Sequence, residues 1–326
     1  MIKYDDTLNG ESEEIPYIKK NISYRESYLN DGDIVIADTA EDETVGKAIE
    51  LYNITTNIVS GLHTIPCRPK VNFYSGYLGY YLNSFAYRKQ LLPLMQGIKV
   101  LSLSKTNISK TLLRYPDILE QEKIANMFNL INKKISLQKR QIELLKSYKR
   151  GALQRVFSKN ISGKPLYEIT SYSSSSLTLS SLGNAPAGKY PVYDASGVSR
   201  YIDTYQMKDD YIAIIKDGSG VGNLQFCNSK SNIIGTLGAI MSNVTPIKYI
   251  YYFLQTVDFK PYITGMAIPH IYYKDYGKLI VPIPGDNEIK NIILCFDEID
   301  RIIKNQELIY HHYKVINQAL LQKMFK

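Results

Sequence analysis

Two stretches of the chain carry a long helical pattern, and this pattern constrains the fold more than any other feature. Residues 116–158 place apolar side chains at alternating intervals of four and three residues, which is typical of a helix that packs lengthwise on another helix. Residues 284–326 carry the same pattern at an offset of 168 residues, the separation of Pro116 and Pro284. Because one helix cannot bury such a stripe alone, we predict that the two helices pair.

The predicted pairing positions correspond one to one between the two helices. They are Ile124, Phe128, Ile131, Ile135, Gln138, Ile142 and Leu145 in the first, and Ile292, Phe296, Ile299, Ile303, Gln306, Tyr310 and Tyr313 in the second. The polar positions, Gln138 and Gln306, fall near the middle of each helix. If the helices run antiparallel, their centres meet, and the two amides can hydrogen-bond and fix the register.

The repeat extends upstream of the helices. Residues 97–116 align with residues 265–284 at the same offset, and weaker matches continue back to Asp33 and Asp210. This is the pattern of a duplicated unit, each copy made of a globular domain and a long helix. We therefore predict an α+β fold with two similar mixed domains, and with the helices paired as an antiparallel coiled coil of pseudo-two-fold symmetry. The predicted boundaries are 1–115 and 159–283 for the domains, and 116–158 and 284–326 for the helices.

Local patterns predict the contents of each domain. An apolar run at residues 31–40 predicts a buried strand, and a first strand is expected near residues 15–18. Residues 76–92 predict one short amphipathic helix, and residues 97–116 and the matching residues from Gly265 onward predict loop and strand. The serine-rich residues 171–181 predict a loop, and residues 158–165 predict a polar link between the two copies.

Composition indicates a polyanionic partner and a reducing compartment. The net charge of +8 and the pI near 9.0 favour nucleic acid, with an anionic membrane surface as second choice. The three cysteines, Cys67, Cys227 and Cys295, lie too far apart to suggest a disulfide framework or a zinc site. Without an apolar run near the roughly 20 residues that span a bilayer, or an apolar segment at the N-terminus, we expect a cytoplasmic location.

The motifs with possible chemistry favour structural interpretations. Residues 217–223 are rich in glycine, but a phosphate loop requires a helix to follow, and the next residues predict strand and turn. Asp117, Glu120 and Glu122 resemble a nuclease pattern, yet acidic residues at a helix start usually cap it. The four histidines lack companions at metal-ligand spacing, and the Asn/Asp-Pro-Pro-aromatic tetrad of amino-methyltransferases is absent from the sequence. We therefore predict no catalytic residue and no metal site.

Basic and aromatic residues recur in the loops of both copies. A charged loop is usually only solvated, but recurrence at equivalent places in a basic protein favours contact with DNA. The candidate DNA-binding residues are Lys47, His63, Arg68, Lys99 and Lys105 in the first copy, and Lys189, Arg200, Lys216, His270, Tyr272 and Lys274 in the second.

The helix starts carry a motif of known type. Pro116, Glu120-Gln121, Lys123-Ile124-Ala125, Phe128 and Ile131-Asn132 together resemble the specificity subunit of type I restriction-modification enzymes. The second copy departs from the motif, since Glu288-Ile289 replaces the Glu-Gln pair.

The resemblance implies a DNA reader without catalytic activity. Each domain would recognise one half of a split, asymmetric double-stranded DNA sequence. The helices would space the domains and dock two modification subunits, and restriction subunits would join that complex. S-adenosylmethionine would be bound by the modification subunits, so the chain itself needs no cofactor.

Two other interpretations stay open from the sequence. One is a self-contained DNA methyltransferase or nuclease with an unrecognised site, which methyl-donor binding by the isolated chain would reveal. The other is a silent or recombining cassette that supplies recognition domains only. The target bases do not follow from the sequence, because base contacts depend on the placement of loop side chains.

Overall fold

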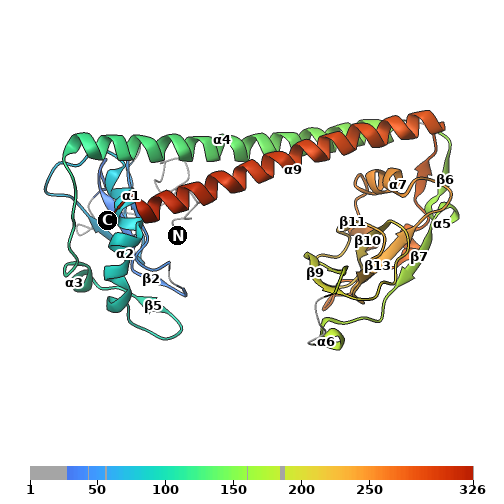
Figure 1. Ribbon diagram of the computed structural model, residues 1–326, viewed down its shortest axis with the longest axis horizontal. Helices are drawn as coiled ribbons and strands as arrows, with labels where there is room; N and C mark the ends of the chain where they lie inside the picture. Colours follow the sequence, from blue (N-terminus) through green and yellow to red (C-terminus); the bar gives the residue numbers. More distant parts are fainter. Residues whose placement is uncertain (1–27, 43, 56, 160, 184–187, 326) are drawn as a thin grey trace. The chain divides into compact units, whose positions relative to one another are not determined.

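The computed structural model describes residues 28–42, 44–55, 57–159, 161–183 and 188–325. The strand expected near residues 15–18 lies outside these residues. The chain divides into two compact units (Figure 1): unit 1 comprises Met1–Gln141 with Gln306–Lys326, and unit 2 comprises Ile142–Asn305. Each long helix therefore contributes one part to each unit.

The elements of unit 1 are mostly short. In chain order they are β1 (Ile34–Ala37), β2 (Thr39–Ala40), β3 (Ala48–Glu50), β4 (Thr64–Cys67), α1 (Tyr77–Asn83), α2 (Phe85–Leu91), the 3-10 helix η2 (Leu92–Leu94), β5 (Leu101–Ser102), α3 (Lys105–Ile108) and the long helix α4 (Ile118–Phe157), which continues into unit 2.

Unit 2 has the larger set of strands. Its elements are β6 (Gly163–Pro165), α5 (Leu166–Ile169), β7 (Ser171–Ser174), α6 (Leu179–Leu182), β8 (Tyr190–Asp194), β9 (Gly197–Ile202), β10 (Tyr211–Ile215), β11 (Leu224–Cys227), β12 (Asn232–Ile233), β13 (Leu237–Met241), α7 (Ile247–Leu254), the 3-10 helix η3 (Lys260–Tyr262), α8 (Tyr273–Tyr276), β14 (Ile280–Pro282) and α9 (Asp286–Lys323), which ends in unit 1.

A buried central strand organises the sheet of unit 1. Strand β1 pairs antiparallel with β3 and β4, so that Val35 lies opposite Ile49 on one side and Pro66 on the other. All residues of β1 are buried, as the apolar run in the sequence predicts. The β2–β5 pair lies on the side of unit 1 away from α4 (Figure 1).

A buried carboxylate joins this sheet to helix α1. Glu50, at the end of β3, accepts hydrogen bonds from the backbone N–H groups of Gly76 and Gly79 at 2.7 and 2.9 Å. These groups lie at the N-terminus of α1, where a negative charge complements the helix dipole. Burial raises the pKa of the Glu50 carboxyl, and the backbone hydrogen bonds offset part of that rise.

A buried central strand also organises the larger sheet of unit 2. Strand β10 is fully buried between β11 and β13, and β7 extends the sheet beyond β13. A second sheet has the order β12-β8-β9. Helix α7 packs against the larger sheet through buried residues that include Ile250 and Leu254.

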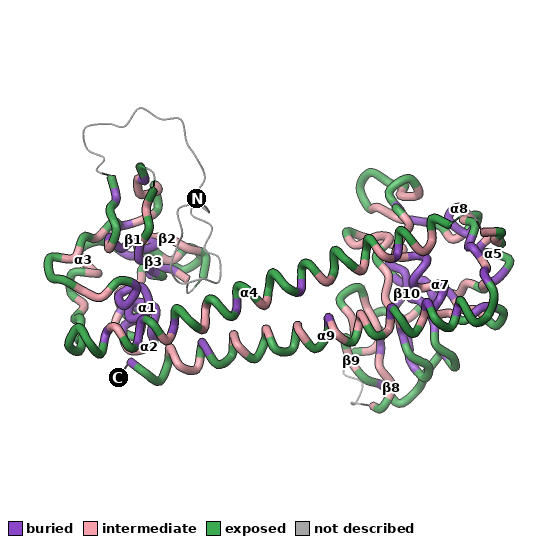
Figure 2. The backbone as a smooth tube through the Cα atoms, turned by 90° about the horizontal axis from the view of Figure 1, so that it is seen from above, coloured by how far each residue is buried: buried purple, intermediate pink, exposed green. Residues whose placement is uncertain are grey.

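Within each unit, the two long helices pack on the globular part and on each other. Every predicted pairing position is buried or half-buried. Figure 2 shows buried and half-buried segments recurring among exposed ones along α4. In unit 1, Phe128 stacks on Tyr80 with ring centroids 4.7 Å apart, and the Tyr80 hydroxyl bonds to Asn129 and Asn132. The apolar period therefore identifies the buried face of each helix.

Hydrogen bonds between α4 and α9 set their relative direction. In unit 1, Asn317 donates to Asn132 at 2.9 Å, and Gln138 donates to the Gln306 side chain and, at 3.3 Å, to its carbonyl oxygen. Moving forward along α4 thus means moving backward along α9. The contact expected between the two central glutamines is present.

Replacing the central glutamines with leucine, first one and then both, should show how much their mutual hydrogen bond contributes to stability. Gln138→Leu alone leaves the half-buried Gln306 amide without its partner and should destabilise unit 1 by about 1 kcal/mol. The double variant with Gln306→Leu should be as stable as the parent or more stable, because both amides are replaced by apolar groups. Chemical denaturation checks this, and additive losses in the double variant would contradict it.

The structure corrects three local expectations. The helix expected at residues 76–92 is interrupted at Ser84, whose extended backbone ends α1 and whose hydroxyl accepts from the Tyr87 N–H to start α2. The serine-rich residues 171–181 form strand β7 and most of helix α6, where a loop was expected. Strand β7 lies at the edge of its sheet, and an edge strand needs backbone pairing more than apolar side chains. A short helix, α3, occupies residues expected to be loop and strand.

Two motif interpretations are confirmed. Residues 217–223 connect the antiparallel strands β10 and β11, and no helix follows them. At the start of α4, the Asp117 side chain accepts from the Glu120 N–H at 2.9 Å, as a helix cap does.

Candidate nucleic-acid interface

Each unit contains a hairpin of similar form. We define hairpin 1 as residues 96–102 in unit 1 and hairpin 2 as residues 264–270 in unit 2. Backbone bonds close hairpin 1 between Gln96 and Ser102, at 3.0 and 2.8 Å. The same pair of bonds closes hairpin 2 between Thr264 and His270, at 2.9 and 2.8 Å.

Both hairpins depend on a glycine at their second position. Gly97 has a φ of 120° and Gly265 a φ of 88°, a region that other residues rarely adopt. A Cβ would lie 1.9 Å from the Val100 carbonyl oxygen at Gly97, and 2.4 Å from the Ile268 carbonyl oxygen at Gly265. The sequence therefore specifies the same tight turn in both places.

Hairpin 1 and the helix after it carry two of the predicted cations. Lys99 lies near the tip of hairpin 1, and Lys105 is the first residue of α3; both are exposed. Lys105 also lies close enough to β4 that its charge partly offsets the rise that burial causes in the pKa of Cys67. Lys47 is exposed on the turn before β3. These cations are accessible to a polyanion.

The other two predicted residues of unit 1 are paired with carboxylates. His63 is exposed, and its Nδ1 lies 3.7 Å from Asp38. Arg68 donates to both oxygens of the buried Asp33, at 2.7 and 2.6 Å. Burial alone would raise the pKa of Asp33, but bonds from Arg68 and the Asn30 N–H hold it below its ordinary value.

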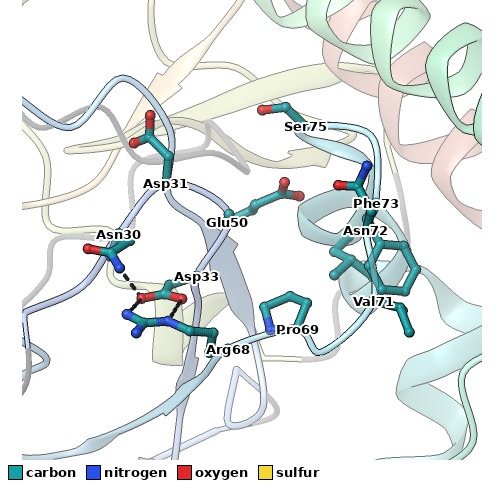
Figure 3. A pocket seen from close by; sticks show the side chains of 12 residues that line it. Asn30, Asp31, Asp33, Glu50, Arg68, Pro69, Val71, Asn72, Phe73 and Ser75 are labelled. Carbon is teal, nitrogen blue, oxygen red and sulfur yellow. Dashed lines mark hydrogen bonds and ion pairs between the residues drawn. The ribbon is translucent and has the colours of Figure 1, made fainter.

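Arg68 borders a polar pocket rather than an open basic surface (Figure 3). The pocket has a volume of about 530 Å³, and Asp31, Asp33 and Glu50 contribute carboxylates to its lining. A DNA phosphate would be repelled by such a lining. The structure therefore gives Arg68 a role in holding Asp33, and its assignment to DNA contact stays a prediction.

In unit 2, the structure brings four predicted residues together. Backbone bonds join hairpin 2 to the glycine-rich connection after β10: the Ile271 N–H donates to the Lys216 carbonyl at 3.0 Å. The His270 ring contacts Tyr272 edge to face at 5.0 Å, and the Lys274 ammonium lies 5.2 Å from the Tyr272 ring centre. The cluster Lys216, His270, Tyr272 and Lys274 thus combines cations with an exposed aromatic ring.

The same cluster has defined hydrogen-bonding capacity. Nδ1 of His270 lies 3.1 Å from the Ile268 carbonyl oxygen, which can only accept, so Nδ1 donates. The Nε2 atom is then left as the second hydrogen-bonding group of the ring. Lys216 is partly neutralised by Asp217, 2.6 Å away. Cations, an aromatic face and a polar ring nitrogen are the groups that contact phosphates and base edges.

The remaining predicted residues of unit 2 lie at the β12-β8-β9 sheet. Lys189 is exposed just before β8. Arg200, on β9, donates to the Gly183 carbonyl oxygen at 2.7 Å. No contact joins these two residues to the cluster at hairpin 2 among the described residues.

The tips of the hairpins also carry apolar residues, which are not among the basic and aromatic candidates that the sequence predicts. Ile98 and Met266 occupy equivalent positions and are fully exposed, at 101% and 106% of the reference area. The aligned letters GIKV and GMAI contained the signal, since a glycine turn followed by an apolar residue predicts an apolar tip. The expectation of loop and strand for this segment does not include the exposure of its apolar residues.

The described residues hold no group of three or more His, Cys, Asp or Glu that could bind a metal ion. Among the helices of that same part, none combines the length and apolar character needed to cross a bilayer.

One relative in sequence covers most of the chain. It is a protein of Methanocaldococcus jannaschii, provisionally described as the specificity subunit of the type I restriction enzyme MjaX, and is 23% identical over 334 aligned residues. The alignment covers 89% of this chain and 77% of the relative. No family model matches the chain.

Solved structures share the fold. The type I specificity subunit from M. genitalium matches with a TM-score of 0.60 at 17% identity, over 92% of this chain and 84% of that one. A chain from a study of complex assembly and conformational transition in a type I restriction-modification system gives the same score and identity, over 94% and 84%. At 17% identity, the likeness to these structures shows similarity of fold alone. Together with the sequence relative it confirms the resemblance: the chain is similar, in sequence and in fold, to specificity subunits of type I restriction-modification systems.

Proposed function

We propose that the chain is a specificity subunit that reads a split, asymmetric DNA sequence, with one half read by each unit. The observation that carries the proposal is the recurrence of one hairpin in both units beside basic side chains, which in unit 2 are joined by the aromatic rings of His270 and Tyr272. The net charge of +8 is of the sign that attracts DNA. The named relative supports the same role.

Repeated contacts support the descent of both units from one ancestral unit. The offset of 168 relates Asn129 and Asn132 on α4 to Asp297 and Asp300 on α9. In unit 1 the two asparagines bond to the Tyr80 hydroxyl, at 2.8 and 3.0 Å. In unit 2 the two aspartates accept from the Tyr252 hydroxyl, at 2.5 and 3.2 Å. Each domain thus uses one tyrosine to attach to equivalent helix positions.

Polar contacts between the helices follow the same relation. The Asn132–Asn317 pair in unit 1 maps, through the offset, onto Asp300 and Lys149, which form an ion pair of 2.6 Å in unit 2. Gln138 and Gln306 map onto each other. These contacts favour an antiparallel pairing with pseudo-two-fold symmetry, which suits a protein that presents two related readers to DNA.

We propose that the modification subunits dock on the helices and bind S-adenosylmethionine, and that restriction subunits join them. In this assignment the chain positions the target and carries out no bond-breaking step. Phosphate contacts from Lys99, Lys105 and Lys274 would position the duplex, and His270 and Tyr272 would contact base edges.

The purified chain is expected neither to methylate nor to cut DNA, and to direct methylation once its modification partner is added. The assay supplies tritiated S-adenosylmethionine and genomic DNA from a strain that lacks the system. Mass spectrometry verifies that the chain is free of partner subunits. Turnover by the chain alone would contradict the assignment and favour a self-contained enzyme.

Replacing Lys99 by alanine should weaken binding to all DNA sequences about equally. A lost phosphate contact should also reduce the salt slope of the binding constant by roughly one counterion. The measurement is fluorescence anisotropy of the assembled complex over a range of salt concentrations. Lys99→Arg keeps the charge and is the matched control; an unchanged slope in Lys99→Ala would refute the phosphate contact.

A further inference from the structure

We propose that the tips of hairpins 1 and 2 are apolar wedges that insert Ile98 and Met266 at base steps of the bound DNA. This inference rests on the proposed function, because it names how each unit engages its half of the target. Neither Ile98 nor Met266 is among the DNA-binding residues that the sequence predicts.

Exposure is the first argument. Ile98 and Met266 are as accessible as a side chain on an isolated extended peptide, at 101% and 106%. The next outward apolar residues, Val100 and Ile268, are also exposed. A single exposed apolar side chain is ordinary, but full exposure at the same position of two matched hairpins is a repeated feature. The repeat indicates a shared ligand.

Rigidity is the second argument. Each tip is held by a closing pair of backbone bonds and by a glycine turn that tolerates no Cβ. A wedge must resist being pushed aside while it separates stacked bases, so a short closed hairpin suits it better than an open loop. Isoleucine and methionine are among the residues that act as wedges between base steps.

The positive charge around the tips favours DNA over an apolar protein surface as the partner. Lys99 lies between Ile98 and Val100 in hairpin 1. At hairpin 2, Tyr272 and Lys274 follow directly and make a cation–π contact of 5.2 Å. An apolar protein surface would leave these ammonium groups desolvated without compensation, whereas phosphates on both sides of a base step would pair with them. The tips therefore fit a groove flanked by negative charge.

The insertion has a measurable consequence. A wedge unstacks a base step and bends the duplex, and the cost is recovered by burying the apolar side chain and by closer phosphate contact. Unstacking should occur once in each half of the target, at a step that depends on the hairpin of that unit. The unstacked step should lie at a different position from the base that becomes methylated.

The test uses the complete complex with its modification subunits and duplexes that carry the sequence methylated in the native strain. Adenines other than the methylated one are replaced singly by 2-aminopurine, whose fluorescence rises when it unstacks. Ile98→Ser should abolish the rise in one half of the target and Met266→Ser in the other. Each should weaken binding about tenfold, because the complex with DNA no longer buries one large apolar side chain.

Matched controls are available in both units. Leu62→Ser in unit 1 and Val244→Ser in unit 2 also remove exposed apolar side chains, but from turns outside the hairpins, and should leave both signals unchanged. If the parent complex binds its target without any such rise, or if the hairpin variants behave like the controls, the wedge is refuted while the proposed function stands. Loss of modification subunits from the hairpin variants in size-exclusion chromatography, with unchanged DNA signals, would also overturn it. A parent complex that does not prefer its target would refute the proposed function itself.

Discussion

Replacing Phe128 by alanine is expected to lower the free energy of unfolding of unit 1 by about 3–5 kcal/mol. Phe128 is fully buried where α4 meets α1, and its ring lies 4.7 Å from that of Tyr80 and 5.9 Å from that of Phe325. Removing the ring forfeits its burial and leaves a cavity among other rings that cannot close it completely. Because Phe128 contacts rings from both α1 and the end of the chain, its loss weakens the core of unit 1 on two sides.

Hydrogen exchange measured by mass spectrometry can assign this loss to one unit. In Phe128→Ala, amides of β1 and α1 should exchange faster while those of β10 and α7 keep their protection, because each unit has its own core. Leu130→Ala is the matched control, since Leu130 lies on the same helix and is 63% exposed; its effect should stay within about 0.5 kcal/mol. Equal losses of protection in both units would contradict independent cores.

The second large effect is expected at the DNA. His270→Ala should change the preferred bases in one half of the target and leave the other half unchanged. The ring is oriented by the Ile268 carbonyl and by Tyr272, so it offers Nε2 at a fixed place. Losing one base contact costs about 1–3 kcal/mol of discrimination at that base pair.

Competition binding with a library of targets mutated at single positions measures this change. The preference should fall by about 5- to 150-fold at one or two adjacent base pairs, the range that corresponds to such a loss. His311→Ala is the matched control, because His311 is exposed on α9 and belongs to neither hairpin. Equal changes in both halves of the target would contradict the assignment of hairpin 2 to one half-site.

The sequence could predict the long helices because their burial has a regular period. Positions such as Ile124, Ile135 and Ile303 are buried for the same reason that they recur at intervals of three and four residues. The contact between Gln138 and Gln306 followed from the antiparallel alignment of two similar patterns. Helix α4 extends over Ile118–Phe157, close to the predicted 116–158.

Other features depend on tertiary contacts that a sequence pattern does not contain. Ser84 divides one predicted helix into two because its hydroxyl caps the start of α2, and a single serine gives little warning of that. Strand β7 is serine-rich and is formed by its backbone pairing with β13. Arg68 carries the charge expected of a DNA contact, but the buried Asp33 holds its guanidinium. The candidate site was therefore predicted as a set of loops, while its division into accessible and paired cations required the structure.

The central claim is that this chain decides which DNA sequence its complex modifies. Genome-wide sequencing of methylated bases in the native organism, with the gene present, deleted and restored, tests it most directly. We predict that one split motif, made of two half-sequences separated by a fixed unread spacer, disappears on deletion and returns on restoration. Restoring the gene with His270→Ala should bring back a motif altered in one half only. If every methylated motif persists unchanged in the deletion strain, the chain does not supply the specificity that we assign to it.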